Sequence, residues 1–270
     1  MEFLAIFLSS LITLVSPAGF VVDRVAQNAI RKQFKSVEQL DVRIDNAPSY
    51  QLVQGKVDRV RISGRGLFPA DDIRLDVLEV ETDPIQLEAS RLRRGKTQLE
   101  KPLRAGVRLV LTQADLNRAL RSPTVLKRLT SLGVNALGQS NGSQRSQRYS
   151  LLNPRLTFVA NQRLQLQAEL QEASDPTTLN IVAESGVEII AGRQLRLTNP
   201  TVFINKEAVP EQVIRPIVKG ISDQADLHLL EKSGITARIL QLNLTENQIS
   251  MAAFVQIVPN PSRQRAKSNL

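Results

Sequence analysis

Few residues of this chain are of the types that carry out catalysis. The sequence has no Cys and a single His, which excludes a disulfide, a Cys-based metal site, a thiolate nucleophile and a His cluster. His228 lies in the short run Ala-Asp-Leu-His, where a surface or helix-end position is expected. The Ser-Gly-Arg-Gly motif at residues 63–66 lacks the Lys-Ser/Thr pair of a nucleotide phosphate loop, so its glycines are expected at a strand end or bulge.

A group of acidic residues between positions 71 and 81 is the remaining candidate for chemistry. Asp71, Asp72, Asp76, Glu79 and Glu81 could be imagined as a cation site. Alternation along the predicted strand instead places them on its solvent face. We therefore expect no enzyme activity, no metal site and no cofactor.

Positive charge is concentrated in one stretch of the chain. The net charge is +9 and the isoelectric point about 10.2. Residues 91–148 hold thirteen Lys or Arg and two acids, a net +11 that exceeds the charge of the whole chain. A solvated face is one interpretation, and a surface for lipid headgroups or nucleic acid is the other. With 4% aromatic residues and no Trp, base stacking is disfavoured and nucleic acid is an unlikely partner. The candidates for headgroup docking are Arg91, Arg93, Arg94, Lys96, Arg118, Arg121, Lys127 and Arg128.

The N-terminus is uncharged over residues 3–22, which is long enough to cross a bilayer. The same residues also fit a signal peptide, with an apolar region over residues 3–15 followed by Ser16, Pro17 and Ala18. Basic residues after position 22 would hold the domain on the cytoplasmic side if the segment were a retained anchor. A third interpretation is that residues 3–22 form a buried helix of the domain.

Most of the remaining chain alternates apolar and polar residues as half-buried strands do. Ile73, Leu75 and Val77 alternate, and continuation at Val80 would need a bulge near residues 78–79. Amphipathic helices are predicted from residue 17 to about 35, from Thr112, with Asp115 completing its cap, and from Pro210. The pattern predicts an α+β fold of mainly antiparallel sheet covered by helices, with a polar insertion at residues 138–148.

The aliphatic strand faces could fill a core or leave an apolar groove for acyl chains. Alternation alone selects the candidate groove residues Val60, Ile62, Leu75, Val77, Leu109, Leu166, Ile189, Leu242 and Met251.

Several stretches resemble the LmeA-like phospholipid-binding family. They lie at residues 22–31 (VDRVAQNAIR), 54–62 (QGKVDRVRI), 80–85 (VETDPI) and 109–117 (LVLTQADLN), and the likeness runs from about 22 to 257. The resemblance implies a tubular lipid-binding (TULIP) type of fold, in which a strongly curved antiparallel sheet wraps helices and encloses acyl chains. It also implies phospholipid binding and an extracytoplasmic place in the cell envelope.

These observations lead to one organisation and two functional hypotheses. Residues 1–18 are expected to be a signal or membrane anchor, 19–258 the lipid-binding domain and 259–270 a basic disordered tail. The first hypothesis is a non-enzymatic phospholipid-binding protein that docks on anionic membranes. The alternative is a membrane-anchored scaffold with a filled core and a protein partner.

Overall fold

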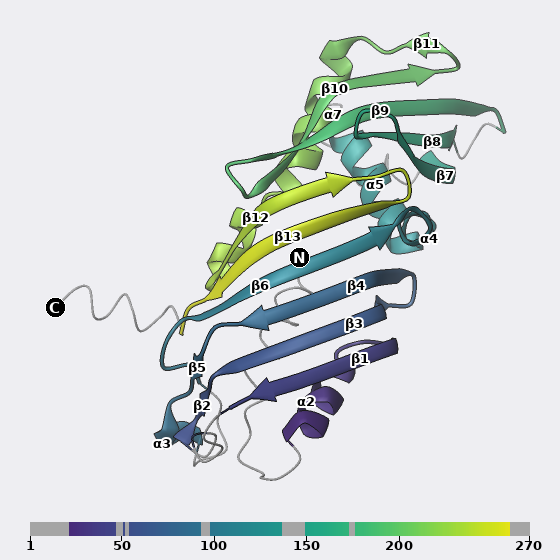
Figure 1. The fold of residues 1–270 in the computed structure, drawn as a ribbon. Coiled ribbons are helices and arrows are strands. Elements are labelled where there is room, and N and C mark those ends of the chain that lie inside the picture. The colour runs from purple at the N-terminus through teal and green to yellow at the C-terminus, as the bar shows by residue number, and fades with distance from the viewer. Residues whose placement is uncertain are drawn as a thin grey trace.

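The structure is a computed structural model that describes residues 22–46, 51, 54–92, 98–136, 149–172 and 176–259. Two antiparallel sheets dominate it, one above the other in Figure 1. The lower sheet has six strands. In spatial order they are β1 (Ser36–Asp45), β3 (Arg59–Ala70), β4 (Ile73–Thr82), β6 (Leu103–Thr112), β13 (Gln248–Ile257) and β12 (Ile235–Leu244).

The upper sheet has five strands and is built mainly from the second half of the chain. In spatial order they are β11 (Glu207–Ala208), β10 (Gln194–Ile204), β9 (Thr178–Ile190), β8 (Arg163–Glu172) and β7 (Tyr149–Val159). A two-stranded ribbon, β2 (Lys56–Val57) with β5 (Ile85–Gln86), lies at one end of the lower sheet.

Helices cover the rear of both sheets in the view of Figure 1. Helix α2 (Val22–Arg31) packs against β1, and α7 (Glu211–Gln224) packs against β10 and α5 (Pro123–Ala136). Helix α4 (Gln113–Leu120) contacts β4, β6 and β7 and so touches both sheets. Two further short helices are present among the described residues, α3 (Ala89–Leu92) and the 3-10 helix η2 (Leu227–Ser233).

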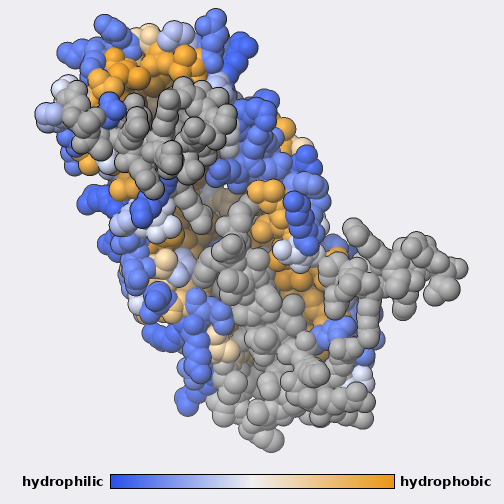
Figure 2. Space-filling view, turned by 180° about the vertical axis from the view of Figure 1, so that it is seen from behind, coloured by the Kyte–Doolittle hydropathy of each residue, from blue (hydrophilic) through white to orange (hydrophobic). Residues whose placement is uncertain are grey.

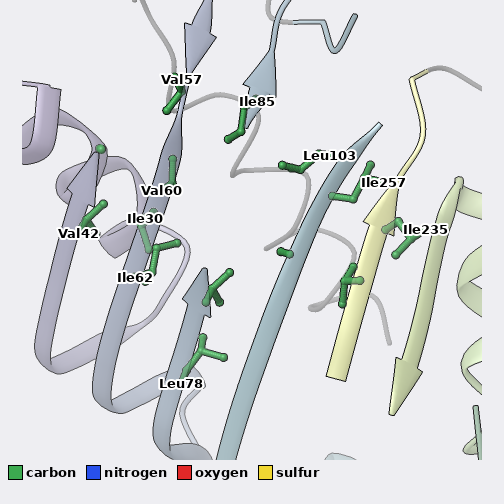
Figure 3. Close-up of a cluster of buried hydrophobic side chains, with 14 of the residues drawn as sticks. Ile30, Val42, Val57, Val60, Ile62, Leu78, Ile85, Leu103, Ile235 and Ile257 are labelled. Atoms are coloured by element: carbon green, nitrogen blue, oxygen red, sulfur yellow. The ribbon is translucent and has the colours of Figure 1, made fainter. Parts of the chain in front are cut away.

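The main hydrophobic core lies under the six-stranded sheet. Ala26 and Ile30, one turn apart on α2, are fully buried, and Val60 and Ile62 of β3 are at most 2% exposed. Figure 3 shows side chains of α2 and of the strands converging on this core. Each buried aliphatic side chain of this size stabilises the fold by about 1.5–3 kcal/mol. Helix α2 and the six-stranded sheet therefore form one packed unit.

The predicted fold class is confirmed, since the protein is α+β with open, curved antiparallel sheets and amphipathic helices. The predicted cap of α4 is also confirmed, because Thr112 accepts a hydrogen bond from the Asp115 backbone and the Asp115 carboxylate accepts one from Thr112 N.

The predicted bulge near residues 78–79 is wrong. β3 and β4 pair without interruption from Arg61 opposite Glu81 to Arg65 opposite Val77. The register between β3 and β4 shifts instead between Leu67 and Ala70. This shift follows Gly66, which has a φ of +58°. This left-handed residue twists the end of the hairpin, so that Leu67 joins the core.

Candidate functional site

The five-stranded sheet carries an apolar face, interrupted by Ser185, that is not part of the main hydrophobic core. Cross-strand pairs such as Leu156 with Leu166, Ala168 with Ile181 and Ile181 with Ile204 place these side chains on one face. The large aliphatic side chains on it are all partly accessible, unlike those of the core. The face consists of Leu156, Phe158, Leu164, Leu166, Ala168, Leu170, Leu179, Ile181, Ala183, Val187, Ile189, Leu195, Leu197, Val202 and Ile204.

None of these residues belongs to the main hydrophobic core. Helices α5 and α7 pack against β7 and β10, yet the large side chains of this face remain partly accessible. Apolar side chains are visible at the upper end of the molecule and near its centre when it is seen from behind (Figure 2). We name this set the open face.

The open face is long enough for a lipid chain. From Leu179 to Ile189 it follows one strand over ten residue steps, or about 33 Å at 3.3 Å per residue. Half the hydrocarbon thickness of a bilayer is about 15 Å, which is the depth that one leaflet's chains occupy. An acyl chain could therefore lie lengthwise on the open face with room to spare.

The groove residues selected by alternation divide between the two sheets. Val60 and Ile62 are core residues closed over by α2, while Leu75 and Leu109 are partly buried and pack against that core. Val77 lies on the opposite face of the six-stranded sheet, because its cross-strand partners are Arg65 and Val110.

The remaining groove candidates are partly accessible. Leu166 and Ile189 lie on the open face. Leu242 and Met251 form a cross-strand pair between β12 and β13, at the border of the six-stranded sheet that faces the other sheet. The structure thus brings together only part of the predicted set.

The docking candidates are also divided, at the two ends of β6. Arg91 lies on α3, just before the Leu103 end of this strand, whereas α4 begins at the other end, about 33 Å away by strand length. Arg118, Arg121 and Lys127 are exposed near the α4–α5 corner, and Arg118 stacks 5.7 Å from the centre of the Phe68 ring. Arg93, Arg94 and Lys96 lie outside the described residues, as does the side chain of Arg128.

Helix α4 is held in place by an ionic network in which Asp115 is buried and Glu38 is largely exposed. The Arg74 guanidinium bonds Asp76 at 2.9 Å, Glu38 at 3.0 Å and Asp115 at 3.1 Å. Asp115 is 4% exposed and also caps α4. The hydrogen bond from Arg74 lowers the pKa of Glu38, and the carboxylates around Arg74 raise the pKa of the guanidinium. The network anchors the start of α4 to β1 and β4.

Two side chains of α4 seal the edge of the five-stranded sheet. Asn117 donates to Leu156 O and accepts from Leu156 N, both at 2.8 Å, and Gln113 accepts from Phe158 N at 2.9 Å. β7 is the last strand of its sheet, and these amides replace the strand that would pair with it. We name this contact the α4–β7 seam. The sequence analysis did not predict this contact. Its only trace in the sequence is the pair of amide side chains Gln113 and Asn117, four residues apart on one helix face.

No catalytic constellation is found in the part of the chain that the structure describes. The residues of the Ser-Gly-Arg-Gly motif lie within β3 and not in a loop, and a Cβ on Gly64 would meet Leu67 at 2.6 Å. His228 is exposed and bonds Glu231 at 2.8 Å. The described carboxylates and histidine form no metal-binding group.

The predicted signal or anchor, the polar insertion and the C-terminal tail fall mainly outside the described residues. Among the helices that are described, none has the length and hydrophobicity needed to span a membrane.

Comparison with known proteins gives one family. A search of curated proteins and a search of solved structures returned no match. The sequence model of the LmeA-like phospholipid-binding family matches residues 14–254, nearly the whole chain. The chain belongs to the LmeA-like phospholipid-binding family.

Proposed function

We propose that this protein binds phospholipid without transforming it, with the acyl chains lying against the open face. The observation that carries the proposal is the contrast in burial between two similar aliphatic faces. Val60 and Ile62 are sealed by α2, while Leu166 and Ile181 remain partly accessible. Covering an accessible aliphatic face with an acyl chain is favourable by about 25 cal/mol per Å².

We assign headgroup docking to the α4–α5 corner. Arg121 and Lys127 are exposed and form no ion pair with any described residue, so their charge is available to phosphate groups. Both helices contact β7, the border of the open face, whereas α3 lies at the far end of the other sheet. Each Lys or Arg near an anionic membrane surface contributes about 1 kcal/mol to attraction.

The family supports a cellular setting, which is part of the same proposal. In this proposal, residues 1–18 direct the chain to the membrane and residues 19–258 bind lipid outside the cytoplasm. Residues 259–270 form a basic disordered tail. The absence of a constellation for catalysis among the described residues is compatible with a carrier.

Native mass spectrometry of the purified full chain tests lipid binding. We expect phospholipid to co-purify and Ile181→Gln to reduce the bound fraction severalfold, since it places an amide on the open face. Val182→Gln is the matched control, because Val182 is the next residue of β9 and points to the other face. Absence of lipid from the wild type, with binding of a protein partner, would favour the scaffold alternative.

Vesicle binding tests the docking surface. Arg121→Glu with Lys127→Glu should weaken binding to vesicles of phosphatidylglycerol, and salt should reduce the difference. Lys101→Glu with Arg104→Glu makes the same change of charge at the α3 end, where both side chains are exposed. If this second pair weakened vesicle binding more than the first, the docking surface would have to be assigned to the α3 end.

A further inference from the structure

Exposed apolar side chains gather at one end of the five-stranded sheet. Among the described residues, five large apolar side chains are exposed. Three of them, Leu179, Phe203 and Val213, are 38–40% exposed. The other two, Leu229 and Leu240, lie on η2 and β12.

Backbone contacts place the three residues at the same end. Phe203 pairs with Ala208 of β11, and Asn205, two residues on, donates its N–H to Asn180 O, next to Leu179. Val209 N bonds Val202 O, which ties the start of α7, and with it Val213, to the same hairpin. Figure 1 shows β11 and the start of α7 together at the top of the molecule. We name this region the β11 end.

The β11 end carries an exposed apolar side chain on each face of the sheet. Leu179 pairs with Leu170 and belongs to the open face. Phe203 pairs with Val182 and lies on the opposite face. A protein partner docked on one face of a sheet would leave the other in water, whereas a bilayer surface surrounds an inserted end from all sides.

We propose that the β11 end inserts into the surface of a phospholipid bilayer and is where an acyl chain moves between the bilayer and the open face. The inference rests on the proposed lipid binding and adds the place of loading. Leu179 makes the open face continuous with the membrane, because the face begins at this residue and runs inward through Ile181.

The depth of insertion is limited by the hairpin itself. Asn205 and Lys206 at its tip are polar and exposed, and β11 is the outermost strand of the sheet. Unpaired backbone groups are costly in the hydrocarbon core, so contact is confined to the interfacial region, roughly 5–10 Å deep. Lys206 can bury its carbon stem there and place its ammonium among the phosphates.

Tryptophan fluorescence tests the location directly, because the chain contains no Trp. Phe203→Trp creates a single probe at the β11 end, and Leu240→Trp creates one on β12, where the native side chain is 72% exposed. With vesicles of phosphatidylcholine and phosphatidylglycerol, Trp at 203 should shift its emission to shorter wavelength. Brominated acyl chains should quench it severalfold more than Trp at 240.

Generic hydrophobic adsorption would give the opposite ranking, since position 240 is the more exposed of the two. Equal quenching at both positions, or stronger quenching at 240, would overturn the proposal. A silent probe at 203 with lipid still co-purifying would reject loading at the β11 end and leave lipid binding intact. Absence of both signals would reject lipid binding itself.

Lipid transfer between vesicles gives a second readout. Leu179→Asp with Phe203→Asp should slow transfer of a fluorescent phospholipid severalfold, while Leu240→Asp should not. All of these positions are already partly in water, so circular dichroism should show native folding. Unchanged transfer by the folded double variant would contradict the proposed loading site.

Discussion

The two sheets have the same alternating sequence pattern, but their apolar faces differ in how deeply they are buried. In the six-stranded sheet, β3 presents Val60 and Ile62 to α2, which seals them at 0–2% exposure. In the five-stranded sheet, Leu166 and Ile181 occupy equivalent positions of an apolar face and remain accessible. Covering by a helix has thus separated a structural core from a surface suited to a lipid chain.

The connection between the sheets is also uneven. On the side of β7 it includes the α4–β7 seam, and at β12 the Ile239 N–H donates to Gly192 O at 2.5 Å. These are hydrogen bonds at edges and turns, with none of the continuous strand pairing found inside each sheet. The second sheet is therefore expected to be the more mobile of the two when no lipid is bound.

The largest expected effect is a difference between identical truncations in the two sheets. Ile62→Ala should lower the free energy of unfolding by about 2–5 kcal/mol, because it leaves a cavity under α2. Ile181→Ala in lipid-free protein should cost about 1 kcal/mol or less, since its side chain is already partly hydrated. Urea denaturation measures both. Equal losses would mean that the open face is packed as tightly as the core.

Removal of lipid should destabilise the sheets unequally. A ligand present at a hundredfold excess over its dissociation constant stabilises the folded state by about 2.7 kcal/mol. We expect delipidation to speed hydrogen exchange in β8 and β9 while leaving β3 and β4 nearly unchanged. Protection lost uniformly across both sheets would show that lipid binding is not local to the open face.

The sequence predicted the faces but not which of them would be covered. Alternation at Val60 and Ile62 is the same kind of signal as at Leu164 and Leu166, and only the tertiary placement of α2 distinguishes them. Val77 lies on the face opposite Val60 and Ile62 for a local reason. Ideal alternation ends near Gly66, whose positive φ turns the hairpin end and brings Leu67 and Leu75 to the core without Val77.

The basic stretch shows a second limit of sequence reasoning. The basic residues of 91–148 lie in one stretch of sequence, but this stretch contains β6. The ten-residue strand separates the docking candidates on α3 from those on α4 and α5. The cap formed by Thr112 and Asp115 could be predicted because it depends on residues three apart. The seam could not, because Asn117 and Leu156 are 39 positions apart.

The α4–β7 seam can be weakened without touching either apolar face. Asn117→Ala removes both hydrogen bonds to the backbone of Leu156, which should cost about 1–2 kcal/mol. Hydrogen exchange at Leu156 should accelerate, and transfer of lipid should change with it if this edge moves during loading. Asn243→Ala, at an exposed position of β12, is the control. An unaffected Leu156 amide would show that the seam does not protect β7.

The smallest expected effect is a pH dependence confined to the six-stranded sheet. The hydrogen bond from Arg74 lowers the pKa of Glu38 in the folded state. The stability that ionised Glu38 contributes to the folded state is therefore present above the ordinary pKa of glutamate. It is lost as the pH falls through the lowered pKa. Glu38→Gln should flatten this part of the stability profile while leaving Arg74 bonded to Asp76 and Asp115. Glu207→Gln, on β11, should not, because Glu207 is exposed and forms no ion pair with a described residue. An equal flattening by both variants in acid urea titrations would refute a specific role for the Glu38–Arg74 pair, since it would reflect only the loss of one surface charge.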